Sequence, residues 1–279
     1  MKKQAIVTGG TQGIGTEICR QLLAQNFEVI FIGRDKSSGA AVQKDLQSAY
    51  PGLSVKYLPG DLGNIASCKQ LASEIQSHTD KIDLLINNAG IWPTTLSTNS
   101  DGLEMAFMVN HLAPLILTKE LLPHIQKADN SRIVNVNAGL YIKGKASAEE
   151  TPYGKDFHKI KTYCNTKLCN VMATLEIADR LKGSGTTINA LHPGVIKTQL
   201  GDFGGIMGVL LRFVKRFWKT PAQGAEAPVW LATAPELKGV NGKYYNEKEE
   251  MELSDDAKDA SLRKSIWDKS LELAGLSWN

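Results

Sequence analysis

Several kinds of protein are excluded by what this 279-residue sequence lacks. It holds only four cysteines, Cys19, Cys68, Cys164 and Cys169, and none of them forms the C-x-x-C pair that is typical of metal and redox sites. The five histidines also lack metal-ligand spacing, so we expect no metal site. We interpret the cysteines as reduced and mostly buried side chains.

Long apolar runs and a strong charge of one sign are absent as well. No stretch approaches the roughly 18 consecutive apolar residues that a membrane-spanning helix requires. The start, Met1-Lys2-Lys3-Gln4, lacks the apolar core and cleavage site of a secretory signal, so we expect a cytoplasmic protein. The net charge of +3 argues against nucleic acid as a partner, because a nucleic-acid protein normally shows a concentrated basic face.

No linker rich in proline or serine divides the chain, and hydrophobic residues make up 42% of it, so we predict a single globular domain. Short runs rich in valine and isoleucine follow one another without clear alternation, which is typical of strands buried on both faces of a parallel sheet. The predicted strands are Gln4–Thr8, Glu28–Ile32, Val55–Pro59, Ile82–Asn87, Arg132–Val136, Thr187–Leu191 and a stretch near Lys243–Tyr245.

Amphipathic stretches with helical periodicity lie between these strands. The predicted helices are Ile14–Ala24, Ser37–Ala49, Ile65–Ser77, Leu103–Ile125, Phe157–Leu181 and Ala222–Thr233. The alternation predicts an α/β fold of the Rossmann type, doubly wound around a largely parallel, seven-stranded sheet. We expect a cofactor half over about residues 1–135 and a catalytic and substrate half over about 136–279. The stretches 141–155 and 200–219 are irregular, and the acidic run Glu247–Asp256 is expected to be solvated.

A glycine-rich turn joins the first predicted strand to the first predicted helix. It reads Thr8-Gly9-Gly10-Thr11-Gln12-Gly13-Ile14-Gly15. Glycines let backbone amides approach a phosphate, and the following helix N-terminus adds free N–H groups and a positive dipole end. The spacing differs from the common G-x-G-x-x-G, but it can do the same physical work. The turn therefore predicts a dinucleotide-binding site.

The residue after the second strand indicates which dinucleotide binds. A carboxylate there would hold the ribose hydroxyls of NAD, whereas the guanidinium of Arg34 would pair with the 2′-phosphate of NADP. Lys36 can add to this charge. Asp35 is a complication, because a small backbone shift would bring its carboxylate to the ribose. The sequence favours NADP(H), with a surface role for Arg34 as the alternative.

Further motifs follow in a fixed order along the chain. They are Asp61-Leu62 after the third strand, Asn87-Asn88-Ala89-Gly90 after the fourth, Tyr163-x-x-x-Lys167 at the start of a long helix, and His192-Pro193-Gly194-Val195-Ile196-Lys197-Thr198 after the sixth strand. Together with Thr8-Gly9-x-x-x-Gly13-Ile14-Gly15, this series resembles the short-chain dehydrogenase/reductase superfamily. The resemblance covers essentially the whole chain.

A narrower resemblance is to the retinol-dehydrogenase-like branch of that superfamily. It rests on Asp101-Gly102-Leu103-Glu104, Val109-Asn110-His111-Leu112, Arg132–Val136, the long gap before Tyr163 and the Gly242–Tyr245 stretch. The resemblance implies an NADP-dependent oxidoreductase that interconverts carbonyls and alcohols on lipophilic molecules, a carbonyl reductase in the reductive direction. It does not name the substrate, because function depends on the site and not on the fold.

The resemblance also implies a set of cofactor contacts. The acid after the third strand would contact the adenine, and the loop after the sixth strand would touch the nicotinamide end. The implied cofactor-binding residues are Gly9, Thr11, Gln12, Gly13, Ile14, Gly15, Arg34, Asp61, Leu62, Asn88, Ala89, Gly90, Tyr163, Lys167, Pro193, Gly194, Ile196 and Thr198.

Tyr163 and Lys167 carry the predicted chemistry. Carbonyl reduction needs a hydride on carbon and a proton on oxygen, and the phenol of Tyr163 is the candidate acid, with its phenolate as the base in the reverse direction. A free tyrosine has a pKa of about 10. The ammonium of Lys167, four residues on and thus on the same helical face, is expected to lower that pKa. By resemblance, Lys167 would also hold the nicotinamide ribose.

Asn110 lies within the helix predicted over Leu103–Ile125. In the family, an asparagine here holds a water that links the lysine to solvent as a proton relay. The alternative is a structural role, in which the amide mends a local helix distortion.

One departure from the family's pattern follows the fifth strand. Where the family has two serines, the second of them catalytic, this chain has Asn137 and Ala138, and the alanine has no donor. Loss of one donor in such a site typically costs ~10²–10³-fold in rate. Three interpretations stay open. The Asn137 amide replaces the hydroxyl; another donor, Tyr141, Ser147 or Thr151, folds in; or the chain is a catalytically impaired NADP-binding sensor or partner-binding protein.

In the family, the region 200–219 forms a mobile lid over the substrate. Here it combines apolar side chains with Arg212, Lys215, Arg216 and Lys219. The apolar residues suit a bulky lipophilic substrate, and the basic ones suit an interfacial helix on an anionic membrane. A lid alone, a lid with peripheral membrane contact through 206–219, and an oligomer contact are the three alternatives. Members of the family are often dimers or tetramers, so the resemblance suggests a homodimer or homotetramer.

Overall fold

A computed structural model of the chain describes residues 2–195 and 219–278. Within these ranges, eight strands form one sheet in the order β3-β2-β1-β4-β5-β6-β7-β8. The strands are β1 (Lys3–Thr8), β2 (Phe27–Gly33), β3 (Val55–Pro59), β4 (Leu84–Asn87), β5 (Arg132–Val136), β6 (Thr187–His192), β7 (Tyr244–Asn246) and β8 (Glu249–Met251). All neighbours up to β7 pair in parallel, and β8 pairs antiparallel with β7.

The predicted doubly wound α/β fold is confirmed, and the seven predicted strands correspond to β1–β7. The acidic run Glu247–Asp256 adds β8, an edge strand that the sequence pattern did not indicate. All three side chains of β8 are exposed, so it carries none of the apolar pattern that reveals a strand. Charged residues are expected on such an edge, because they oppose pairing with another chain.

The helices lie close to their predicted positions. They are α1 (Gly13–Ala24), α2 (Lys36–Ala49), α3 (Ile65–His78), α4 (Met105–Phe107), the π-helical turn η1 (Met108–Leu112), α5 (Ala113–Ile125), α6 (Lys161–Arg180), α8 (Pro221–Thr233), α9 (Asp255–Lys258) and α10 (Ala260–Ala274). Three helical segments differ from the prediction. The helix expected over Leu103–Ile125 is widened by η1 in its middle, and neither α9 nor α10 was predicted.

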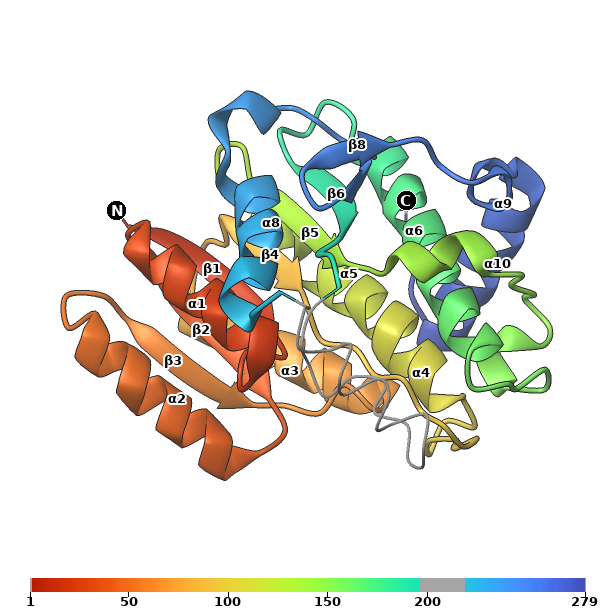
Figure 1. The fold of residues 1–279 in the computed structure, drawn as a ribbon, viewed down its shortest axis with the longest axis horizontal. Helices are drawn as coiled ribbons and strands as arrows, with labels where there is room; N and C mark the ends of the chain where they lie inside the picture. Colours follow the sequence, from red (N-terminus) through yellow and green to blue (C-terminus); the bar gives the residue numbers. More distant parts are fainter. Residues whose placement is uncertain (1, 196–218, 279) are drawn as a thin grey trace.

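Two layers of helices cover the sheet, and the pleat of the strands decides which residues face each layer (Figure 1). Ile6 and Leu85 point to a core shared with α3, α5 and α6, whereas the next residues, Val7 and Ile86, point to a core shared with α1 and α8. All four cysteines are buried and unpaired, as predicted. No helix in the described ranges combines the length and hydropathy that a bilayer crossing requires.

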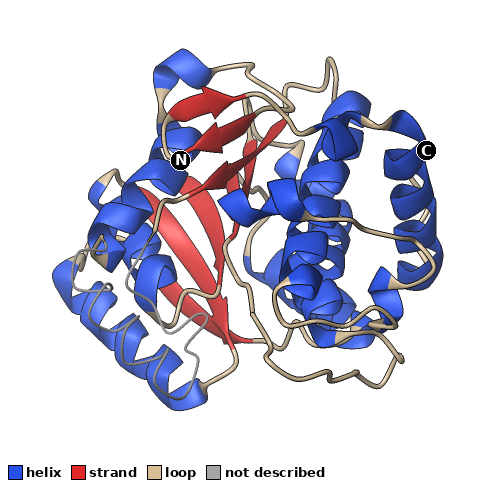
Figure 2. Cartoon of the chain, turned by 45° about the vertical axis from the view of Figure 1, so that its right-hand side comes forward, coloured by secondary structure: helices blue, strands red, loops and turns tan. Residues whose placement is uncertain are grey.

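The last helix, α10, packs against α6 on the side away from the sheet (Figure 2). Arg263 of α10 forms an ion pair with Glu176 of α6 at 2.8 Å. The imidazole of His111 in η1 and the hydroxyl of Ser270 in α10 form a buried hydrogen bond of 2.7 Å. These contacts hold α10 against the two helical segments that border the candidate site.

Candidate active site

The parallel strands β1–β7 end at one edge of the sheet, where ligands bind in folds of this class. The glycine-rich turn between β1 and α1 lies at this edge. Gly9 has a φ of +68°, which favours glycine. A Cβ on Gly15 would lie 2.0 Å from the Gly9 carbonyl oxygen, so α1 starts too close to the turn for any side chain there. The Thr16 hydroxyl donates to the Gly10 carbonyl at 2.9 Å and closes the turn.

The N-terminus of α1 has the character of an anion site. Within the described ranges, its N-cap residue Gln12 makes no side-chain hydrogen bond to the helix, and the first turn holds no acidic residue. A Cβ on Gly13 would meet no described atom within 4 Å. Helix N–H groups that no side chain satisfies, next to open space, fit the pyrophosphate of a dinucleotide. Thr11 and Ile14 flank this opening.

The turn after β4 is tied to the glycine turn. The Asn88 amide donates to the carbonyls of Thr8 and Gly9 at 2.9 and 3.3 Å. The backbone N–H groups of Asn88 and Ala89 both donate to the Thr8 hydroxyl at 3.0 Å. Asn88 therefore braces the glycine turn through its side chain.

The Asp35 side chain is hydrogen-bonded to the helix that follows it, whereas the Arg34 side chain is exposed. The Asp35 carboxylate caps α2 by accepting from the Ser38 N–H at 2.6 Å, and this bond lowers the pKa of Asp35. Arg34 is exposed at the end of β2. A Cβ on Gly33 would lie 2.3 Å from the Thr11 side chain, so the end of β2 packs directly under the glycine turn. Within residues 2–195 and 219–278, the Arg34 guanidinium makes no hydrogen bond or ion pair, so it is available for a ligand.

Asp61 and Leu62 follow β3, as predicted. The Asp61 side chain is exposed and accepts from the Gly63 N–H at 3.0 Å, and Leu62 is buried beneath it. This places one carboxylate at the surface of the sheet edge, where the resemblance implies an adenine contact.

Lys167 is buried at the centre of the candidate site. Its Nζ donates to the Val136 carbonyl at 3.2 Å and lies 5.8 Å from the centre of the Tyr163 ring. A Cβ on Gly90 would be 3.5 Å from this nitrogen, so Gly90 leaves room for it. Burial lowers the pKa of Lys167 from 10.5 to about 8. The charged form of Lys167 is therefore less favoured here than in water.

Asn110 connects three segments around Lys167. Its Oδ1 accepts from the Ile91 N–H at 2.8 Å, and its Nδ2 donates to the Ile91 carbonyl at 2.9 Å and to the Thr166 hydroxyl at 3.1 Å. The distorted helix around it, η1, is bonded by a different amide, since Asn170 donates to the Asn110 carbonyl at 3.1 Å. The side chain of Asn110 thus crosses to the turn after β4 and does not mend its own helix.

Tyr163 lies under a second aromatic ring. The Trp92 indole stacks on its phenol with centroids 4.2 Å apart and an interplanar angle of 6°. Tyr163 is only 4% exposed, and burial raises its pKa above the ordinary value. The expected lowering by Lys167 is therefore not found in this structure. The reason is that desolvation of the buried phenolate dominates, and the neighbouring Cys164 raises the pKa further.

Asn137 has no amide hydrogen to spare for a substrate. Its Nδ2 donates to the Lys167 carbonyl at 3.0 Å and to Asn170 Oδ1 at 2.8 Å, while its Oδ1 accepts from the Ala138 N–H at 2.7 Å. These contacts do not support the hypothesis that Asn137 replaces the missing hydroxyl. They make it a positioning residue, which joins the end of β5 to the turn of α6 that carries Lys167.

Two of the other candidate donors, Tyr141 and Thr151, accept hydrogen bonds from backbone N–H groups. Tyr141 is buried in the core, and its hydroxyl accepts from the Ser254 N–H at 3.3 Å. The Thr151 hydroxyl accepts from the Ser147 N–H at 3.0 Å. These bonds tie the irregular stretch after β5 to Ser254 and to itself, and the hydroxyl is the acceptor in both.

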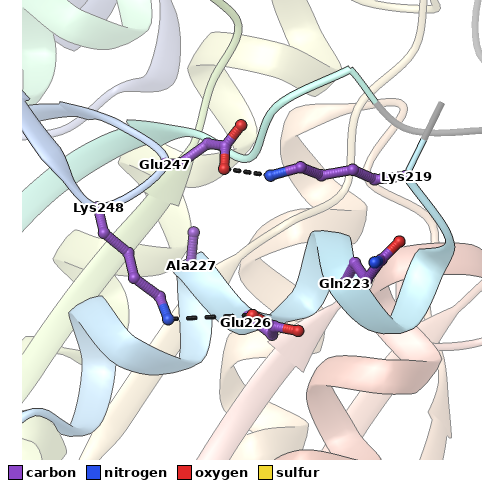
Figure 3. Close-up of a pocket in the computed structure, with 6 residues that line it drawn as sticks. All are labelled: Lys219, Gln223, Glu226, Ala227, Glu247 and Lys248. Atoms are coloured by element: carbon purple, nitrogen blue, oxygen red, sulfur yellow. Dashed lines mark hydrogen bonds and ion pairs between the residues drawn. The ribbon is translucent and has the colours of Figure 1, made fainter. Parts of the chain in front are cut away.

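The loop after β6 is supported from behind by the turn between β7 and β8. Gly194 has a φ of +91°, and a Cβ there would lie 2.8 Å from Glu247 Oε1. Glu247 also pairs with Lys219 across a small pocket of about 100 Å³ (Figure 3). Pro193 and Gly194 are buried against this support. The predicted cofactor residues Ile196 and Thr198, and the expected lid up to residue 218, lie outside the described residues.

Sequence reasoning assigned no role to four residues that border the site. They are Trp92, Thr166, Asn170 and His192. Thr166 and Asn170 lie three and seven positions after Tyr163, so helical spacing alone places them on the same face of α6. Trp92 had no such signal, because its contact with Tyr163 depends on the path of a loop.

Comparisons with known proteins agree with this geometry. The family model "short chain dehydrogenase" matches residues 3–203. Retinol dehydrogenase 14 of Homo sapiens is 34% identical over 293 aligned positions, which cover 98% of this chain and 87% of that protein.

Two solved structures show the same fold. A Mycobacterium paratuberculosis protein superposes with a TM-score of 0.79 at 23% identity, over 99% of this chain and 95% of its own. A blue fluorescent protein from a metagenomic library, crystallised with NADPH, superposes with a TM-score of 0.71 at 25% identity, over 88% of this chain and 96% of its own. The resemblance that the sequence motifs indicated is confirmed. The chain belongs to the short-chain dehydrogenase/reductase family and is an oxidoreductase related to its retinol dehydrogenases.

Proposed function

We propose that this chain uses NADP(H) to interconvert an alcohol and a carbonyl on a lipophilic small molecule, with Tyr163 as the acid and base. The observation that carries the proposal is the pairing of Tyr163 with Lys167, whose Nζ lies 5.8 Å from the centre of the phenol ring. A phenol and an ammonium on one helical face can supply, and then replace, the proton that a carbonyl oxygen gains on reduction.

The site residues fit a nicotinamide dinucleotide. The turn Gly9–Gly15 and the N-terminus of α1 would hold the pyrophosphate, and Asp61 would contact the adenine. Asn88–Gly90 and Pro193–Gly194 would border the nicotinamide end, where Lys167 would bind the ribose. When bound, the cofactor supplies or accepts the hydride. In this proposal, residues 1–135 form the cofactor half, and 136–279 the catalytic and substrate half.

The choice of NADP over NAD is supported by the different environments of Arg34 and Asp35, which follow β2. The Asp35 carboxylate caps α2, which leaves the exposed Arg34 guanidinium as the group beside the glycine turn. A guanidinium suits a 2′-phosphate through bidentate bonds, and Lys36 adds a second positive charge nearby. Two of the solved structures with this fold are complexes with NADPH or NADP, in keeping with this choice.

The proton chemistry divides among three side chains. In reduction, the Tyr163 hydroxyl gives its proton to the carbonyl oxygen, and the Lys167 ammonium stabilises the phenolate that remains. Asn110 and Lys167 both lie close to Gly90. A Cβ on Gly90 would be 3.3 Å from Asn110 Oδ1 and 3.5 Å from Lys167 Nζ. We retain the prediction that Asn110 fixes a water that connects the lysine to solvent.

The substrate class follows from the relatives and from the composition of residues 200–219. Retinol dehydrogenases act, by name, on a long apolar alcohol, and this segment supplies Met, Phe and Trp side chains that suit such a molecule. Retinoid-like alcohols and aldehydes are therefore the proposed substrates, and all-trans-retinal is the natural probe for a carbonyl reductase.

The test is turnover by the purified protein. NADPH oxidation is measured with all-trans-retinal and with a panel of other aldehydes, ketones and quinones. We expect turnover with at least one lipophilic carbonyl. Tyr163→Phe should abolish turnover while the affinity for NADPH, measured by fluorescence, stays as in the wild type. Equal turnover by Tyr163→Phe and wild type would contradict the assignment of Tyr163.

A second function is favoured by one observation, the alanine at position 138. A protein without that donor can bind NADP(H) and act as a cofactor sensor or partner-binding protein. The same assay separates the two functions, because a sensor binds NADPH tightly and oxidises none across the panel.

Location and assembly stay predictions from the sequence. We propose a cytoplasmic protein, a homodimer or homotetramer, with peripheral membrane contact through 206–219 as the alternative to a lid alone. Co-sedimentation with anionic liposomes at physiological salt tests the membrane contact. Protein that stays in the supernatant would remove it.

A further inference from the structure

His192, the last residue of β6, turns its ring toward Gly139. A Cβ on Gly139 would lie 3.4 Å from His192 Cδ2 and 3.9 Å from Nε2. The Cδ2 corner of the imidazole therefore faces Gly139, with Cγ and Nε2 at nearly equal distances. The ring thus lies beside the residue that follows Ala138, where the family's catalytic hydroxyl is missing.

The strand register fixes this neighbourhood. β5 and β6 pair in parallel, and the pairing continues beyond β5 because the Asn137 N–H donates to the Leu191 carbonyl at 2.7 Å. Ala190 packs in the core shared with α6, so His192, two residues on, points to the same face of the sheet. The Asn137 side chain also bonds to α6. Hence the imidazole lies on the face of the sheet that carries Tyr163 and Lys167.

The inner edge of the ring is unsatisfied. His192 Nδ1 is buried and has no hydrogen-bond partner among the described residues. Burial lowers the pKa of His192, Glu247 opposes this shift and Lys167 adds to it, so the imidazole is neutral at pH 7. A neutral ring has one N–H, and a buried lone pair without a partner is less unfavourable than a buried N–H without one. The proton is therefore favoured on Nε2, which would lie 3.9 Å from a Cβ on Gly139.

We propose that His192 donates its Nε2–H to the substrate's carbonyl oxygen and so replaces the hydroxyl that Ala138 lacks. The inference rests on the proposed function and extends it. In reduction, the carbonyl carbon gains the hydride, the oxygen gains the Tyr163 proton, and His192 keeps its own proton throughout. Its bond strengthens as negative charge grows on the oxygen, which makes His192 a catalytic residue of the oxyanion-stabilising kind.

Three variants separate this role from a packing role. His192→Leu removes the donor and keeps an apolar side chain, and His192→Gln keeps an amide N–H near the place of Nε2. Ala138→Ser restores the family's hydroxyl. In the wild-type background we expect His192→Leu to lower kcat/KM for the best carbonyl of the panel by ~10²–10³-fold. His192→Gln should retain most of the activity.

The double variant His192→Leu with Ala138→Ser is the decisive one. If the imidazole stands in for the serine, the new hydroxyl should recover at least about tenfold of the loss, since one oxyanion donor is worth more than this. If His192 only packs, Ala138→Ser should raise kcat/KM by the same factor in the wild-type and the His192→Leu backgrounds, whereas a shared role predicts a larger gain in His192→Leu. His78→Leu, at the exposed end of α3, is the matched control and should leave turnover unchanged.

A binding measurement gives a readout that does not depend on turnover. All-trans-retinal is titrated into the protein in the presence of NADP+, a pair that cannot react by hydride transfer. His192→Leu should weaken this binding about five- to tenfold and leave the affinity for NADP+ unchanged. Ala138→Ser should restore it.

The outcomes keep the two proposals apart. Wild-type protein without turnover on any carbonyl overturns the proposed function, and the binding measurement still decides on His192. Turnover and retinal binding that are equal in wild type and His192→Leu overturn the inference alone. A loss that Ala138→Ser does not restore, or binding of retinal to neither protein, overturns it too.

Discussion

The indole of Trp92 lies flat on the phenol of Tyr163, with centroids 4.2 Å apart, and its Nε1 donates to the Lys159 carbonyl at 2.6 Å. The hydrogen bond fixes the indole at the start of α6, and the stack limits the phenol to one orientation. Such ring pairs contribute about 0.5–1.5 kcal/mol beyond the area that they bury.

Trp92 should therefore matter for turnover although it carries no group that reacts. We expect Trp92→Leu to reduce kcat by roughly threefold to tenfold, in line with the energy of an aromatic pair. Trp92→Phe, which keeps a ring to stack, should lose less. Steady-state kinetics on the best carbonyl gives both values. An order of loss in which phenylalanine is worse than leucine would contradict a stacking role.

Lys167 should make the stability of the fold depend on pH. Its pKa falls from 10.5 in the unfolded chain to about 8 in the fold, so the unfolded state binds more protons between these values. The free energy of unfolding therefore rises with pH across this window, and the charged lysine costs stability below it. Lys167→Met removes this term. The free energy of unfolding of the wild type, taken relative to that of the variant, should rise by a few kcal/mol between pH 8 and pH 10.5.

Denaturant unfolding at several pH values measures this difference. Other groups titrate in the same window, and the comparison with Lys167→Met cancels them. Parallel curves for wild type and variant would show that Lys167 is not desolvated in the folded chain.

Arg34 should decide the preference between the two dinucleotides. Arg34→Gln removes a charged partner of the 2′-phosphate, and such bonds are worth about 1.5–3 kcal/mol, which corresponds to roughly 10- to 100-fold in affinity. The affinity for NADPH should fall by this factor while that for NADH stays unchanged. Asp35→Ala is the control, because it removes the cap of α2. It should cost stability and leave the ratio of the two affinities as it is.

Gly15 should tolerate no side chain. Gly15→Ala places a Cβ 2.0 Å from the Gly9 carbonyl oxygen, so the glycine turn or α1 has to move. We expect loss of NADPH binding and a lower melting temperature. Gly52→Ala, where a Cβ meets no described atom within 4 Å, should change stability by no more than about 0.5 kcal/mol. Equal effects of the two substitutions would mean that the tight turn is not required.

The periodic parts of the fold could be predicted from the sequence, and the contacts between loops could not. Val55–Pro59 and Arg132–Val136 match the predicted strands residue for residue, because each is a short run rich in valine and other residues that favour strands. β8 has three exposed side chains and gave no such signal. The motifs predicted which residues lie at the carboxyl ends of the parallel strands.

The motifs could not predict the pKa values and hydrogen-bond partners of the individual side chains. Spacing alone suggested that Lys167 lowers the pKa of Tyr163, whereas the extent of burial decides the direction. The sequence also suggested that the Asn137 amide could donate to a substrate. The structure shows that both of its hydrogens already donate to α6. Such properties depend on neighbours that come from distant parts of the sequence.

The hydrogen bond between His111 and Ser270 has a consequence for the order in which the site is built. His111 follows Asn110 directly in η1, and its partner belongs to the last helix of the chain. During synthesis, the segment that holds Asn110 leaves the ribosome long before α10 exists. The site therefore receives its final support only when nearly the whole polypeptide has emerged, and a chain that is released early carries Tyr163 and Lys167 without it.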